Sequence, residues 1–79
     1  MEIKFKFIGM MKALVEGKSE LTLDLTEHCT VADALLTLGI DYKTTKQFNF
    51  AVVNGKKEDP QYVLQPTDDV KIFPRSFGG

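Results

Sequence analysis

Two short segments of alternating polarity, the first of them strict up to Phe7, restrict the fold of this chain more than any other feature. They span residues 2–8 and 20–26, and their apolar members fall on one side: Ile3, Phe5 and Phe7 in the first, Leu21, Leu23 and Leu25 in the second. A period of two is typical of a strand with one buried face. We therefore expect an antiparallel hairpin, with Lys4 and Lys6 near Glu20 and Asp24 on its outer face.

A short helix is predicted to begin at Thr30 and to end before Gly39. Thr30 can accept hydrogen bonds from the first free amides, and Asp33 can reach back to the start of the helix. Gly39 is the expected left-handed stop. The apolar residues form one stripe: Val31, Ala34, Leu35 and Leu38. A helix of about nine residues has little stability alone, so it must pack this stripe on the sheet.

The second half of the chain predicts further strands. Residues 48–53 are rich in β-formers, and the Asn54-Gly55 pair that follows is the strongest short hairpin signal. Residues 56–59 are expected to be a solvated turn. Between Pro60 and Pro66 we expect a loop that returns a few side chains to the core, and residues 70–73 form the last strand. Residues 10–15 are typical of a single helical turn or a compact loop.

These elements predict an α+β fold in a single domain, residues 1–79. The economical arrangement is a mixed sheet of four or five strands with one main helix packed on one face. In this order of elements the last strand can lie in the middle of the sheet, parallel to the first. The end of the chain would then leave from a rigid base.

The composition excludes several classes of protein. Ten basic and eleven acidic residues leave a net charge of −1 without a basic stripe, so we expect no nucleic-acid partner. A single cysteine and a single histidine exclude a disulfide framework and a metal site built from several such ligands. No apolar run approaches the roughly 20 residues that span a bilayer, and residues 1–4 do not resemble a signal peptide. We expect a cytoplasmic protein with no membrane partner.

His28 and Cys29 could be read as a base beside a nucleophile. Adjacent residues seldom aim at one point, however, and a free cysteine is usually a small buried hydrophobic residue. The sequence also offers no Gly-rich phosphate loop and no clustered carboxylates. We therefore expect no catalytic side chain.

The sequence ends in Phe73-Pro74-Arg75-Ser76-Phe77-Gly78-Gly79. Glycine lacks Cβ and has the widest range of backbone angles, so we expect residues 75–79 to form a thin, flexible arm. Such an arm can enter a channel too narrow for side chains and place the Gly79 carboxylate beside a reacting group. The alternative is that the chain frays here, as most termini do.

Taken together, the segments resemble the ubiquitin-like β-grasp sulfur carriers of the MoaD and ThiS family over essentially the whole chain, with MoaD the more similar. The resemblance rests on the following segments: residues 3–7, residues 30–35, Ala51-Val52-Val53-Asn54-Gly55, Asp68-Asp69-Val70-Lys71-Ile72-Phe73-Pro74 and Gly78-Gly79. The connection of residues 9–17 is also closer to MoaD than to ThiS. Arg75 and Phe77 depart from the pattern, because a second proline and a small residue are usual there.

The resemblance implies a fold and a chemistry. The fold is the ubiquitin-like β-grasp. A partner adenylating enzyme of the MoeB or ThiF type would use ATP and Mg to activate Gly79, and a sulfur donor such as a cysteine desulfurase or a rhodanese would convert it to a thiocarboxylate. A MoaE-like large subunit would receive the sulfur for molybdopterin, so this chain would be a non-catalytic subunit or co-substrate without a bound cofactor.

Several residues near the end are candidates for contact with such partners. Gly78 would enter the channel, while Phe73 and Phe77 are candidate docking anchors. Arg75 could pair with an acidic wall. The alternatives are that the phenylalanines pack on neighbouring strand residues and that Arg75 is solvated.

Three further interpretations stay open at the level of the sequence. In the first, the activated Gly79 is joined to lysines of other proteins, as in a protein modifier. In the second, the chain carries sulfur for thiamine synthesis, as ThiS does. In the third, the domain is a passive interaction module and its two final glycines have no function.

Overall fold

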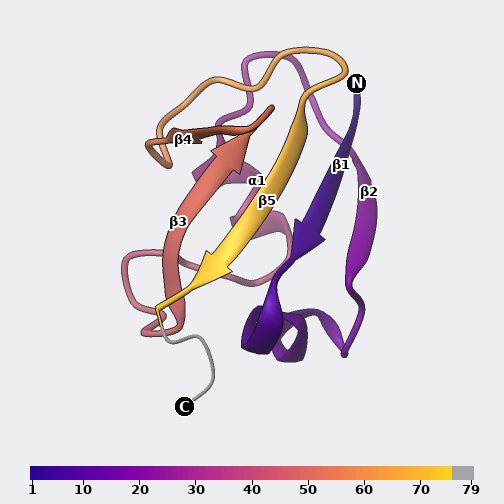
Figure 1. The fold of residues 1–79 in the computed structure, drawn as a ribbon. Helices are drawn as coiled ribbons and strands as arrows, with labels where there is room; N and C mark the ends of the chain where they lie inside the picture. Colours follow the sequence, from indigo (N-terminus) through magenta and orange to yellow (C-terminus); the bar gives the residue numbers. More distant parts are fainter. Residues whose placement is uncertain (76–79) are drawn as a thin grey trace.

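Five strands form one mixed sheet, and helix α1 lies across one of its faces (Figure 1). The computed structural model describes residues 1–75, so Phe77, Gly78 and Gly79 lie outside the described residues. The elements are β1 (Glu2–Phe7), the 3-10 helix η1 (Gly9–Val15), β2 (Glu20–Asp24), α1 (Val31–Thr37), β3 (Phe48–Val53), β4 (Lys56–Glu58) and β5 (Asp69–Pro74). The predicted α+β class, with one main helix and a mixed sheet, is confirmed.

The strand order is β2-β1-β5-β3-β4. β5 lies in the middle and runs parallel to β1, with Phe5 beside Val70 and Phe7 beside Ile72. The other neighbours are antiparallel. The predicted position of the last strand is therefore confirmed, and the chain leaves the sheet between two paired neighbours.

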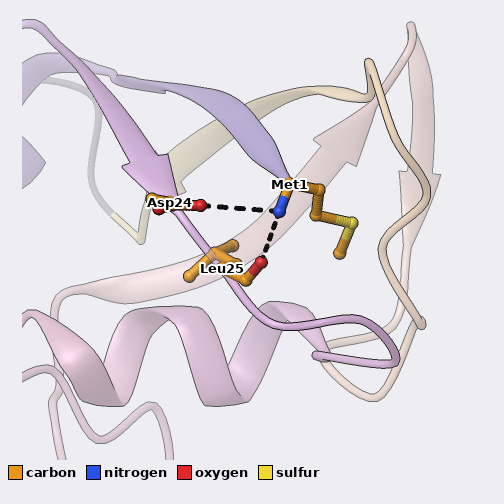
Figure 2. A network of polar contacts seen from close by, with 3 residues as sticks. All are labelled: Met1, Asp24 and Leu25. Atoms are coloured by element: carbon orange, nitrogen blue, oxygen red, sulfur yellow. Dashed lines mark hydrogen bonds and ion pairs between the residues drawn. The ribbon is translucent and has the colours of Figure 1, made fainter.

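The first hairpin forms as its alternation predicts. Lys4 makes an ion pair with Glu20 at 3.4 Å. Asp24 has a different partner: its Oδ1 lies 3.5 Å from the amino group of Met1, which also donates to the carbonyl of Leu25 at 2.7 Å (Figure 2). The register places Lys6 opposite Glu20 and Lys4 opposite Thr22, between Glu20 and Asp24, as expected, while the amino group of Met1 supplies the ion pair to Asp24.

Both hydrogen bonds of the predicted capping box are present at the start of α1. The Thr30 hydroxyl accepts from the amide of Asp33 at 3.0 Å, and the Asp33 carboxylate accepts from the amide of Thr30 at 3.1 Å. The helix ends at Thr37, and Gly39 has the expected left-handed φ of 79°. Leu38 is only half-buried, whereas Ala32 is buried. The buried face is therefore displaced toward the start of the helix.

The core lies between α1 and the sheet. Its largest fully buried side chains come from β1, η1, α1, β5 and the loop before β5: Phe5, Phe7, Ile3, Met11, Leu35, Leu64, Ile72, Val31 and Val70. Leu64 is the side chain that the loop of residues 60–66 returns to the core, while Val63 is 40% exposed. The sequence predicts a turn at residues 56–59, but residues 56–58 form strand β4, because backbone pairing with β3 needs no apolar side chains.

Candidate functional site

The end of β5 is held on both sides by backbone hydrogen bonds. Ile8 donates to the carbonyl of Ile72 at 3.0 Å, and Arg75 donates to the carbonyl of Gln47 at 2.7 Å. Pro74 is buried and lies beside Gly9, where an added Cβ would come within 3.8 Å of the proline ring. The sheet therefore fixes the direction of the chain up to Arg75.

An aromatic pair lies next to this point on the face of the sheet opposite α1. The rings of Phe50 and Phe73 stack with centroids 4.9 Å apart and planes 17° apart, and each residue is half-buried. Lys57 extends from β4 over Phe50, with its Nζ 4.8 Å from the ring centroid. Stacking and a cation over the ring both restrain the aromatic side chains.

Lysine side chains of β4 and β5 lie beside this aromatic pair on the same face. Lys71 of β5 lies beside Lys6 of β1 and opposite Val52 of β3. We define the tail-base surface as Phe50, Val52, Lys57, Lys71 and Phe73. It combines a small apolar centre with positive charge and adjoins the last described residue, Arg75.

The structure resolves part of the prediction for the docking residues. Phe73 does face away from the helix. Val70 and Ile72 are buried on the helix side of β5, and Phe73 lies at an alternate position that points to the other face. The alternative for Phe73 is also confirmed, because the ring packs on its neighbour Phe50. Arg75 is exposed. Phe77, Gly78 and Gly79 lie outside the described residues.

Sequence reasoning missed Phe50 and Lys57. The alternation within residues 48–53 places Phe50 on the face opposite Ala51, but its ring partner depends on the pairing of β3 with β5. A register shift between Phe48 and Phe50 also changes this pairing near its end. The sequence predicts a turn at Lys57, and only the pairing of β4 with β3 brings its ammonium group over the ring.

The adjacent residues His28 and Cys29 differ in their surroundings, since Cys29 is buried and His28 is exposed. Burial raises the pKa of the Cys29 thiol, and the charge of Asp33 adds to this effect. A raised pKa lowers the thiolate fraction and so the reactivity. His28 is exposed and has a left-handed φ of 68°. That this pair does not act as a nucleophile with its base stays a prediction.

Two other features can be stated for residues 1–75. No group of three or more His, Cys, Asp or Glu side chains there is placed to hold a metal ion. No helix in this part of the chain has the length and apolar character needed to cross a membrane.

Solved structures with the same arrangement include those of three named proteins. SAMP1 of Haloferax volcanii, a small archaeal modifier protein, has a TM-score of 0.76 at 18% identity, covering 100% of both chains. A putative molybdopterin converting factor subunit 1 from Pyrococcus furiosus has a TM-score of 0.72 at 20% identity, covering 94% of this chain and 97% of that one. Urm1 from Trypanosoma brucei has a TM-score of 0.70 at 19% identity, covering 99% and 95%.

No protein-family model and no curated protein sequence matches the chain. The similarity to the solved structures extends over nearly the whole length of both partners in each comparison. Strand order, the parallel β1–β5 pair and the capped helix agree with this similarity. The chain therefore has the ubiquitin-like β-grasp fold.

Proposed function

We propose that this protein is a sulfur carrier whose Gly79 carboxylate is the reacting group. The observation that carries the proposal is the geometry at the end of β5. The sheet holds the chain on both sides up to Arg75, and the diglycine follows only three residues later. A rigid base with a slender end suits delivery of a carboxylate into a partner's active site.

The chemistry begins with activation, because a carboxylate is a poor electrophile. The Gly79 oxygen attacks the α-phosphate of ATP in a partner adenylating enzyme of the MoeB or ThiF type, with Mg bound there, and pyrophosphate leaves. A sulfur donor, a cysteine desulfurase or a rhodanese, then displaces AMP. When the sulfur arrives as a persulfide, a thiol cleaves the acyl disulfide, is itself oxidised to a disulfide, and leaves the thiocarboxylate on Gly79.

The proposed recipient of the sulfur is the molybdopterin precursor, bound by a MoaE-like large subunit. The fold shared with a putative molybdopterin converting factor subunit supports this choice, as does the long connection at residues 9–17. The tail-base surface would contact each partner in turn. In this scheme Phe73 and Phe77 are docking anchors, Arg75 pairs with an acidic channel wall, and Gly78 enters the channel.

A second candidate is a protein modifier, in which a lysine amine attacks the same adenylate and forms an isopeptide bond. The fold shared with a protein named as a small archaeal modifier favours it. Both functions use the activated Gly79. They differ in the group that displaces AMP.

The first experiment is the intact mass of the protein with Gly79 as its last residue, after incubation with cell extract, ATP and a sulfur source. The carrier predicts a mass gain equal to the replacement of one oxygen by sulfur. The modifier predicts conjugates of higher mass that contain this chain. If neither forms, the domain is a passive interaction module.

Deletion of Gly79 serves as the matched control. It removes both products under either active mechanism while it leaves the described sheet intact. Replacement of Gly78 by alanine tests the channel, since an added Cβ must hinder entry into a narrow tunnel. Products that persist unchanged in both variants would contradict the proposal.

A further inference from the structure

We propose that the outer edge of β2 and the groove beside it bind an extended segment of a partner protein as an added strand. The partner segment alternates apolar and basic residues. This site is separate from the tail-base surface, so it does not depend on the proposed function. It would let a second protein bind while the end of the chain is engaged.

The backbone of β2 has unused hydrogen-bonding groups along one edge. Met1 and Leu25 exchange two backbone hydrogen bonds, each of 2.7 Å, and Phe7 donates to Ser19 at 2.9 Å. In an antiparallel pair the bonded positions alternate, so every second residue of β2 points its N–H and C=O toward β1. The backbone N–H and C=O groups of Glu20, Thr22 and Asp24 point away from β1, toward the open edge of the sheet. Within residues 1–75 no further strand pairs with this edge.

An apolar groove lies next to the same edge on the helix side of the sheet. Leu21 and Leu23 of β2 are only half-buried there, because they lie at the margin of the sheet. The groove has a volume of about 280 Å³, or about 570 Å³ when the space open to solvent is counted. It is lined by Leu14, Val15, Glu16, Lys18, Leu21, Leu23 and Leu38. An added strand would place every second side chain over this groove.

The charges on the opposite face specify the remaining side chains of the partner. Glu20 and Asp24 are exposed there, on either side of Thr22. β1 shows what β2 accepts: its apolar residues enter the core, and its Lys4 makes the ion pair with Glu20 at 3.4 Å. Opposite charges across neighbouring strands stabilise the pairing. A segment on the free edge should therefore carry lysine or arginine at the positions that face Glu20 and Asp24.

The same charges disfavour a second copy of this chain as the occupant. Two β2 strands related by a two-fold axis at Thr22 would place Glu20 of one copy opposite Asp24 of the other. Like charges directly opposite each other are destabilising. The other edge of the sheet is a poorer site, since β4 has three residues and none of them is buried.

The test uses two blocked peptides, one alternating lysine with valine and one alternating glutamate with valine. Each is titrated into the isotopically labelled protein at low and at moderate salt, and amide NMR signals are followed. At low salt the lysine peptide should bind about tenfold more tightly than the glutamate peptide. Its binding should shift and protect the amides of Glu20, Thr22 and Asp24. Added salt should reduce the difference between the peptides.

Thr22→Pro removes the central donor of the free edge without removing a hydrogen bond to β1, and should abolish binding. Thr22→Val is its matched control, because it keeps the N–H and the strand propensity, and should bind normally. If Thr22→Pro fails to fold, the double variant Glu20→Lys, Asp24→Lys decides the question. That variant should prefer the glutamate peptide.

Four outcomes would overturn the proposal. They are equal binding of both peptides, no binding of either, shifts confined to β4 or to the tail-base surface, and unchanged preference after the charge reversal. Self-association of the free protein through β2, detected by sedimentation, would assign the edge to a second copy and would also overturn it.

Discussion

The side-chain amide of Asn54 donates a 2.7 Å hydrogen bond to the carboxylate of Asp68, and this contact joins the β3–β4 turn to the segment that leads into β5. Asp68 is 7% exposed. It also accepts from the Tyr62 hydroxyl at 3.1 Å and from the Gln65 amide at 2.8 Å. Asn54 in turn accepts from the amide of Asp69 at 2.9 Å. One carboxylate therefore organises the end of the sheet opposite the tail-base surface.

Asp68→Ala should lower the free energy of unfolding by about 2–4 kcal/mol, because three donors at this end of the sheet lose their acceptor. Urea denaturation measures the change. Asp59→Ala is the control: Asp59 is exposed and accepts from the Gln61 amide at 2.7 Å, so its loss should cost less than about 1 kcal/mol. Equal losses in the two variants would show that the Asp68 network adds no stability beyond one ordinary loop hydrogen bond.

The stability should depend on pH through Tyr62. Desolvation raises the pKa of this phenol, and the hydrogen bond to Asp68 and the charges of Asp68 and Glu58 raise it further. A raised pKa means that the folded state favours the neutral phenol. This contribution is complete below the unfolded pKa of about 10 and is lost as the pH rises through the folded pKa.

The free energy of unfolding should therefore fall as the pH rises above about 10, and Tyr62→Phe should reduce the slope of that fall. Denaturation series at several alkaline pH values measure the slope. Tyr42→Phe leaves the Tyr62–Asp68 hydrogen bond intact, so this variant should show the same slope as the wild type. An identical slope in the wild type and in Tyr62→Phe would contradict the assignment.

Leu35 and Leu36 offer a matched test of the helix packing. Leu35 is fully buried against the sheet, whereas Leu36 is 54% exposed. Leu35→Ala should cost about 2–5 kcal/mol, since it removes transfer energy and leaves a cavity. Leu36→Ala should change stability by less than about 0.5 kcal/mol. Thermal and urea denaturation of both variants measure the difference, and similar values would place the buried stripe elsewhere.

Phe73→Ala should weaken binding to the adenylating partner by more than about 1 kcal/mol, because a half-buried aromatic next to Arg75 is an anchor of the proposed docking surface. Calorimetric titration measures the affinity. The loss of the Phe50 stack should cost the fold only about 0.5–1.5 kcal/mol beyond the lost burial, so the domain should remain folded.

Val63→Ala is the control for this experiment, because Val63 is an exposed apolar residue outside the tail-base surface. Its affinity should match that of the wild type. An unchanged affinity for Phe73→Ala would show that this residue is not part of the docking surface. The proposed sulfur chemistry at Gly79 is tested separately, by the intact-mass measurement.

Much of the fold was predictable because its signals are local. The alternation around Phe5 and Leu23, the Thr30–Asp33 capping box and the Asn54-Gly55 turn each depend on residues close in sequence, and the structure contains all of them. Side-chain periodicity and backbone hydrogen bonding decide such features without reference to distant parts of the chain. The order of elements then left few ways to cover one helix face and one sheet face.

The amino-acid sequence by itself determined the class of fold, the cap of the helix and the presence of the terminal diglycine. Only the tertiary structure decided which distant side chains meet. The Phe50–Phe73 stack, the cation over Phe50 and the Asp68 network all depend on strand pairing between segments that are far apart in sequence. The free edge of β2 was likewise decided by strand order, because a strand's own sequence does not specify how many neighbours it will have.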